Sequence, residues 1–206
     1  MFPLGSTVFP GQVVPLHIFE DRYRTLLRLL TDEEASAALP FGHGAFGIVL
    51  IDRGHEVGGG DSRAQVGTKV EILQAEEFED GRWGAVVAGV ERINIIDWLD
   101  DDPYPQAMVT VRPVADNGGG SLVDVEAALL EVITLTAKDA GVEVPGDLVF
   151  STDPHEHLDQ MSALAPLTDF DRQSVLEATT TADQLGLLHE RLEDRLVLLR
   201  AQLGEK

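Results

Sequence analysis

The stretch PGQVVPLHIFEDRYRTLL, from Pro10 to Leu27, joins a Pro-Gly turn and an apolar run to a dense group of charges. Within eight residues it contains a histidine, two carboxylates, two guanidiniums and a phenol: His17, Glu20, Asp21, Arg22, Tyr23 and Arg24. Such a group can form an active site, but the first turns of an amphipathic helix also contain these residue types. The choice between the two decides how the beginning of the chain folds.

The apolar side chains around this cluster favour the helix. They recur at helical spacing and predict a helix of about four turns that begins just after Pro15. Its inner face would contain Leu16, Phe19, Tyr23, Leu26, Leu27 and Leu30. Glu20 and Arg24 are four residues apart, so we expect them to pair on the outer face. The cluster is therefore predicted to belong to a surface helix and not to a catalytic centre.

The composition is that of a folded protein. The chain has 206 residues, of which 44% are hydrophobic and 25% are charged, enough for one substantial core or two small domains. It contains no cysteine, which excludes disulfides, thiolate catalysis and cysteine-based metal sites and is compatible with a reducing compartment.

The net charge of −21 limits the classes of molecule that this protein is expected to bind. A strongly negative protein repels phosphate backbones and anionic lipid, so we expect neither a nucleic acid nor a membrane partner. Residues 1–19 carry no Asp, Glu, Lys or Arg, but prolines and glycines interrupt this run and no basic segment precedes it. It matches neither a signal peptide nor a spanning helix. The sequence therefore predicts a cytoplasmic protein.

The pattern changes along the chain from strands to helices. Residues 1–116 are predicted to form a β-barrel-like unit with one early helix. The predicted strands are STVF, QVV, GAFGIVLID, VGTKVEILQAEEF, WGAVVAGVERINIIDWL and YPQAMVTVRPV. EVGGGD is predicted to be a flexible loop, EDGR a hairpin turn, and Gly89 the site of a bulge or bend. Residues 117–121 form a Gly-rich linker, and residues 122–206 predict a small helical bundle. The predicted fold class is α+β.

Cap signals delimit the predicted helices of the second part. Gly141 is placed as a C-terminal cap. Asp153-Pro154-His155-Glu156 combines an N-cap acid with a first-turn proline, and Thr181-Ala182-Asp183-Gln184 reads as a capping box. His155, His157 and Asp159 suggest a metal site as the alternative, but two histidines two residues apart on a helix point about 200° apart. We expect no metal and no cofactor.

Signatures of catalysis are weak. The sequence has no phosphate-binding loop of the G-x-x-x-x-G-K-[ST] type and no G-x-S-x-G element. A Ser–Lys dyad requires a lysine that burial keeps neutral. Lys69 is predicted on the solvent face of a strand, Lys138 in the last turn of a helix and Lys206 at the terminus. None of the three is therefore expected to act as the base of a dyad. The acidic run from Asp97 to Pro103 lacks the spacing of a calcium loop.

The segment FPLGSTVFPGQVVPLHIFEDRYRTLL closely resembles the start of the amino-terminal, substrate-binding domain of Lon proteases. The positions that match the family's signature are Phe2, Pro3, Leu4, Val8, Phe9, Pro10, Gly11, Pro15, Leu16, Ile18, Phe19, Glu20, Arg22 and Tyr23. FGIVLIDRGHEVGGGD, AVVAGVERINIID and LDQMSALAPLTDFDRQSVLEATTTADQLGLL are similar to later parts of the domain, in the same order. The resemblance implies a PUA-like pseudo-β-barrel followed by a helical bundle. It also implies a stand-alone binding module that lacks the ATPase and peptidase domains.

The function that this resemblance implies is non-catalytic binding of unfolded or hydrophobic polypeptide, as an adaptor or holdase that works with a protease or chaperone. We expect the binding surface in a groove between barrel and bundle, around Phe9, Phe19, Trp98 and Phe150. Two alternatives stay open. PUA-like barrels also bind RNA, and a small hydrolase could combine His17, His43 or His55 with a nearby carboxylate.

Overall fold

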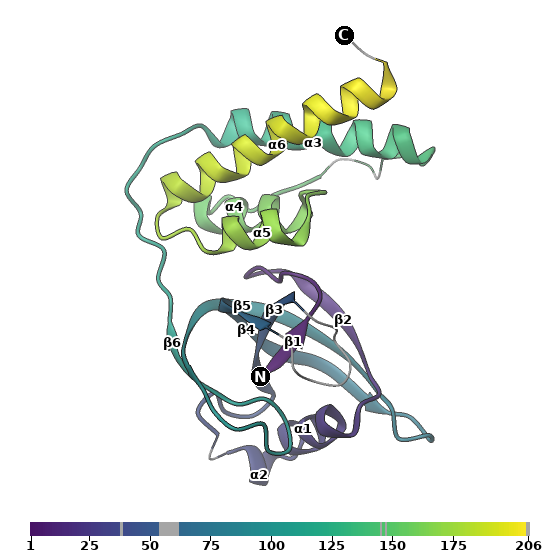
Figure 1. Ribbon diagram of the computed structural model, residues 1–206, viewed down its shortest axis with the longest axis vertical. Coiled ribbons are helices and arrows are strands. Elements are labelled where there is room, and N and C mark those ends of the chain that lie inside the picture. Colours follow the sequence, from purple (N-terminus) through teal and green to yellow (C-terminus); the bar gives the residue numbers. More distant parts are fainter. Residues whose placement is uncertain (38, 54–61, 145, 147, 205–206) are drawn as a thin grey trace. The chain divides into compact units, whose positions relative to one another are not determined.

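A computed structural model describes residues 1–37, 39–53, 62–144, 146 and 148–204. The chain divides into two units, Met1–Arg112 and Pro113–Lys206 (Figure 1). The Gly-rich residues 117–121 thus belong to the second unit. His55, the predicted loop EVGGGD and Lys206 lie outside the described residues.

The first unit is a curled, half-barrel sheet with an early helix. Its elements are β1 (Phe2–Leu4), β2 (Val13–Ile18), α1 (Asp21–Thr31), α2 (Glu33–Ser36), β3 (Ala45–Arg53), β4 (Ser62–Glu77), β5 (Trp83–Trp98) and β6 (Ala107–Val111). The strand order is β1-β3-β4-β5-β2, and β6 also pairs with β5. β1 runs parallel to β3, and the other pairs are antiparallel. The predicted α+β fold with a pseudo-barrel is confirmed.

The long strand β5 positions the rest of the unit. One edge pairs with β4, to which a turn at Gly81 joins it, as predicted. The other edge is shared, because its first half pairs with β2 and its second half with β6. The register slips between these halves, where Glu91 faces Lys69 and Gly89 faces Val70, so Val90 is an extra residue. This confirms the predicted bulge.

The predicted start of the early helix is wrong. Pro15 to Ile18 belong to β2, where Leu16 and Ile18 are buried while His17 is exposed, and α1 begins only at Asp21. Burial therefore alternates with the period of a strand, and pairing of Leu16 with Ala85 in β5 satisfies the backbone. The expectation that Phe19 points inward is also wrong, since its side chain is 52% exposed.

The first predicted strand, STVF, is also misplaced. The strand lies earlier, at β1, where Phe2 faces Ile48 and Leu4 faces Leu50. Val8 and Phe9 are buried outside any strand, and the Thr68 hydroxyl donates to the Val8 carbonyl at 2.6 Å. These side chains are buried although their residues belong to no strand. Their apolar character therefore favours a strand in the sequence that the structure does not contain.

The core of the first unit joins α1 to the sheet. Tyr23, Leu26, Leu27 and Leu30 of α1 are each at most 3% exposed. Their partners in one hydrophobic cluster include Leu16, Ile18, Phe46, Val70 and Val87 of the sheet. This stripe, predicted from its helical spacing, is confirmed from Tyr23 onward.

The second unit consists of helices with clear caps: α3 (Leu122–Ala140), α4 (Pro154–Leu164), α5 (Asp169–Leu176) and α6 (Thr181–Leu203). Gly141 ends α3 in the left-handed conformation and Asp153 caps α4, both as predicted. The capping box of α6 begins one residue earlier than predicted. The Thr180 hydroxyl accepts the Asp183 N–H at 3.1 Å and donates to the Asp183 carboxylate at 2.7 Å.

The Gly-rich stretch before α3 is held against the start of α6. Ala115 exchanges backbone hydrogen bonds with Thr179 and Thr181, at 2.9 and 3.0 Å. The side-chain oxygen of Asn117 accepts the Ala182 N–H at 3.1 Å. These contacts tie the segment to the helical unit.

The core of the helical unit lies mainly between α3 and α6, whose fully buried side chains are Leu129, Val132, Leu188, Leu192, Leu196 and Leu199. It includes a polar contact, in which the Gln184 amide donates to Asp159 of α4 at 2.8 Å. No helix in the described ranges combines the length and the apolar character needed to cross a bilayer.

Candidate functional site

The charged cluster from His17 to Arg24 forms local ion pairs at the start of α1. Glu20 pairs with Arg22 at 3.1 Å, and Asp21 pairs with Arg24 at 2.8 Å, so the predicted Glu20–Arg24 pair is wrong. The reason is the later start of the helix, which places Glu20 before the first turn, at the N-cap position.

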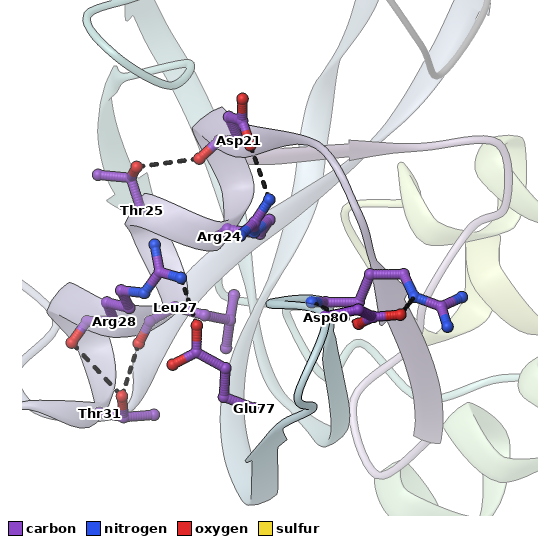
Figure 2. A network of polar contacts seen from close by, with 9 residues as sticks. Asp21, Arg24, Thr25, Leu27, Arg28, Thr31, Glu77 and Asp80 are labelled. Atoms are coloured by element: carbon purple, nitrogen blue, oxygen red, sulfur yellow. Dashed lines mark hydrogen bonds and ion pairs between the residues drawn. The ribbon is translucent and has the colours of Figure 1, made fainter.

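A second charged contact ties α1 to the β4–β5 hairpin. Figure 2 shows Arg28 of α1 reaching Glu77 near the end of β4, with which it forms an ion pair. The Arg28 guanidinium lowers the pKa of the Glu77 carboxyl. Arg24 packs against the hairpin turn, because a Cβ added at Gly81 would meet its guanidinium. The charges therefore orient the helix on the sheet.

Two histidines of the hydrolase alternative, His17 and His43, lie within the described residues and have structural partners. The ring of His17 stacks on Phe78. His43 Nδ1 lies 2.8 Å from the Ser36 hydroxyl, which donates to the Asp32 carbonyl at 2.6 Å. The Ser36 hydroxyl thus lies within hydrogen-bond distance of both groups, and donation of its proton to the carbonyl leaves His43 Nδ1 as the donor to Ser36.

The residues of the metal alternative also have other partners. His157 stacks on Phe150 with ring centroids 4.7 Å apart, and its Nε2 lies 3.4 Å from Glu126. Asp159 accepts from Gln184. Among the described residues, no three His, Cys, Asp or Glu side chains form a group that could hold a metal ion.

The four predicted binding residues have different surroundings, and they come from both units. Phe9 is fully buried, so its ring presents no surface to a client. Phe19 is exposed and lines a pocket of about 170 Å³. Trp98 is half-buried beneath the Arg63 guanidinium, which lies 4.6 Å from the ring centroid. Phe150 belongs to the second unit. Binding at these residues and at a groove between the units stays a prediction.

The first unit contains a larger apolar groove of about 480 Å³. Its lining residues are Met1, Leu26, Leu30, Leu39, Pro40, Phe41, Ala45, Phe46, Gly47, Leu99, Tyr104, Gln106, Ala107, Met108 and Val109. They come from the first residue of the chain, α1, the segment after α2, the start of β3, the β5–β6 loop and β6. We call this site the barrel groove.

Burial is graded from the floor of the barrel groove to its rim. Leu30 and Phe46 at the floor are at most 3% exposed, whereas Leu99 and Met108 are 46% and 52% exposed. Half-exposed apolar side chains beside a concave apolar surface are typical of a binding site.

The surroundings shift the pKa values of two titratable groups in the barrel groove. Burial lowers the pKa of the Met1 α-amino group to about 5; the nearby charge of Arg63 adds to the effect, and that of Asp101 opposes it. This amine donates to the Pro105 carbonyl at 2.7 Å. Burial also raises the pKa of Tyr104. At neutral pH both groups are therefore uncharged, which suits an apolar occupant.

The helical unit contains a smaller apolar groove, of about 320 Å³. It is lined by Ile133, Thr136, Ala137, Ala140, Val142, Val144, Leu148, Leu164 and Pro166.

Comparison with known families accounts for this architecture. Residues 1–194 match the family described as the ATP-dependent protease La (LON) substrate-binding domain. The chain belongs to this family.

Relatives of this Lon substrate-binding domain include full-length proteases. The chain is 26% identical over 198 residues to Lon protease 1 of Hydrogenovibrio crunogenus, covering 95% of this chain and 23% of that protein. It is 25% identical over 206 residues to Lon protease of Escherichia coli K12, covering 98% and 25%. The chain thus spans about a quarter of the length of these curated relatives.

A solved structure is similar in fold. The crystal structure of a Lon N-terminal domain protein from Xanthomonas campestris superposes with a TM-score of 0.56 at 22% identity, over 95% of each chain. The likeness supports the barrel-and-helices fold of the Lon substrate-binding domain.

Sequence reasoning did not identify the barrel groove of this domain. Met108 lies in a predicted strand and Leu99 lies within the acidic run from Asp97 to Pro103, so neither residue stands out in the sequence. A usable signal is the apolar pair Met108 and Val109, which follows the tyrosine and the proline of YPQAMV. Of the predicted binding residues, Trp98 lies nearest to this groove in the packing, because it belongs to one hydrophobic cluster with the lining residues Met1, Phe41 and Val109.

Proposed function

We propose that this Lon substrate-binding domain binds apolar segments of unfolded polypeptide in the barrel groove and does so without catalysis. It would act as a holdase, or as an adaptor that presents clients to a protease or chaperone. The observation that carries the proposal is the 480 Å³ apolar groove with the half-exposed Leu99 and Met108 at its rim. Membership in a substrate-binding family supports a polypeptide as the occupant.

The size of the groove suits a few side chains of an extended segment. Its volume lies within the roughly 300–1,000 Å³ of typical ligand clefts. Each apolar side chain of the client that is fully buried contributes roughly 1.5–3 kcal/mol, part of which is lost to ordering of the segment. We expect weak, reversible binding, with a dissociation constant of about 1 μM to 1 mM.

The test is a titration followed by fluorescence anisotropy. A labelled, permanently unfolded polypeptide is titrated with the protein, beside a folded control protein and an RNA oligomer, each at low and high salt. We expect saturable binding of the unfolded chain alone, and this binding should persist at high salt because apolar contacts are not screened. Binding of the RNA with a steep loss of affinity at high salt would favour the nucleic-acid alternative instead.

Matched variants locate the binding. Leu99→Asp and Met108→Asp place a charge at the rim of the barrel groove, whereas Leu73→Asp makes the same change at a 60% exposed position of β4 outside the groove lining. The first two should weaken binding at least about tenfold, because a client would have to desolvate the new carboxylate. Leu73→Asp should bind as the wild type does. Equal effects of all three, or no binding by the wild type, would overturn the proposal.

A further inference from the structure

Two groups of acidic residues adjoin residues that line the barrel groove. In the first group, Asp97 is the cross-strand partner of Met108 at the rim. Side chains of such partners lie on the same face of a sheet, with Cβ atoms about 5 Å apart. Asp100 and Asp102 follow in the β5–β6 loop, between the lining residues Leu99 and Tyr104, and both are exposed.

The second group of acidic residues belongs to α2. Glu33 and Glu34 are exposed in its first turn. The helix stands in the chain between Leu30 and Leu39, which both line the groove. Within the described part of the chain, neither glutamate forms an ion pair, and the same holds for Asp97, Asp100 and Asp102.

The cations near the groove are neutralised by partners. Lys69 lies over the ring of Phe41, a lining residue, and pairs with Glu91 at 3.4 Å. Arg63 lies over Trp98 and pairs with Asp101 at 2.8 Å. The surroundings of the groove are thus negative, in line with the net charge of −21.

From this arrangement we infer that the barrel groove selects apolar segments flanked by lysine or arginine over apolar segments flanked by acidic residues. The inference rests on the proposed function and specifies the class of client. The apolar residues of the segment would fill the groove, and its basic flanks would lie beside the β5–β6 loop and α2. Complementary charge at a rim favours the matching partner and repels the opposite one.

Two synthetic peptides test the inference. They share a labelled apolar core of Leu, Val and Phe, and carry either two Lys or two Glu at each end. At about 50 mM salt the Lys-flanked peptide should bind roughly tenfold more tightly, and at about 500 mM the difference should shrink to roughly twofold, because exposed charges are screened at high ionic strength.

Neutral variants separate the rim charge from the overall charge. Asp100→Asn with Asp102→Asn removes two charges beside the groove. Glu76→Gln with Glu79→Gln removes two exposed charges of the first unit outside the groove lining. The first double variant should lose most of the preference for the Lys-flanked peptide, and the second should retain it.

The outcomes distinguish this inference from the function on which it rests. Equal affinity for both peptides at low salt, or the same loss of preference in both double variants, would overturn the inference and leave polypeptide binding intact. Failure of both peptides and of the unfolded polypeptide to bind at either salt concentration would overturn the proposed function itself.

Discussion

At the scale of single residues, burial separates aromatic side chains that look alike in the sequence. Phe9 and Phe19 both follow an apolar residue near a proline or a charged turn, yet Phe9 is fully buried and Phe19 is 52% exposed. The sequence could not distinguish them, because the difference depends on where β2 ends and α1 begins.

Replacing these two rings should have very different effects on stability. Phe9→Ala should cost about 3–5 kcal/mol, since it leaves a cavity in the core, whereas Phe19→Ala should change stability by less than about 0.5 kcal/mol. Both tryptophans, Trp83 and Trp98, belong to the first unit, so tryptophan fluorescence in a urea titration follows the unfolding of this unit. Similar losses for the two variants would contradict the assignment.

Gly89 illustrates a close backbone contact. Its N–H donates to the Gln12 carbonyl at 2.9 Å, and its carbonyl accepts from Gly11 at 2.8 Å. A Cβ added at Gly89 would lie 2.1 Å from the Phe9 carbonyl oxygen. The bulge was predictable from a glycine inside a strand, but the turn that packs against it was not, because that contact is far away in sequence.

Gly89→Ala should therefore destabilise the first unit by about 2 kcal/mol or more, because the backbone of the 9–12 turn must move. Gly186→Ala is the comparison: it lies inside α6 with no atom within 4 Å of the added Cβ, and should stabilise the helix by about 0.5–1 kcal/mol. Tryptophan fluorescence reports the first variant and far-UV circular dichroism the second. A neutral Gly89→Ala would show that the turn is not held as described.

At the scale of elements, the helices of the second unit were the most predictable. Cap residues and periodic leucines are local signals, so Asp153, Gly141 and the α6 stripe could be read directly from the sequence. The structure of the PLHIF segment could not be predicted in this way, because its apolar spacing fits both a strand and a helix. Pairing with β5 decides in favour of the strand.

The cap of α4 should depend on pH. Hydrogen bonds from the backbone N–H groups of Glu156 and His155 lower the pKa of Asp153 below its ordinary 3.8. A lowered carboxyl pKa stabilises the fold fully above 3.8, and this contribution disappears as pH falls through the folded-state value. Asp153→Ala should therefore be less stable than the wild type at pH 7, and the difference should shrink below pH 3.8.

Circular dichroism of thermal unfolding at several pH values measures this difference. Asp139→Ala serves as the control, because Asp139 lies in the last turn of α3, where a negative charge opposes the helix dipole. Its removal should not destabilise the protein at pH 7. A destabilisation by Asp153→Ala that is the same at pH 7 and pH 3 would show that the carboxylate charge does not contribute.

At the scale of the whole molecule, fold and family followed from the sequence, whereas the barrel groove did not. The signature at the start of the chain indicated the Lon substrate-binding domain, and the family match over residues 1–194 confirms it. The groove combines side chains from six separate segments, brought together by the curl of the sheet. Neither periodicity nor composition carries that information.

Site-specific photocrosslinking tests most directly whether this groove holds the client. A photoreactive phenylalanine analogue replaces Met108 at the rim or, as the control, Leu73 of β4, and each protein is irradiated with the labelled unfolded polypeptide. We predict covalent adducts from position 108 that an excess of unlabelled client suppresses, and few from position 73. Equal adducts from both positions, or none from position 108 while the polypeptide still binds, would contradict binding in the barrel groove.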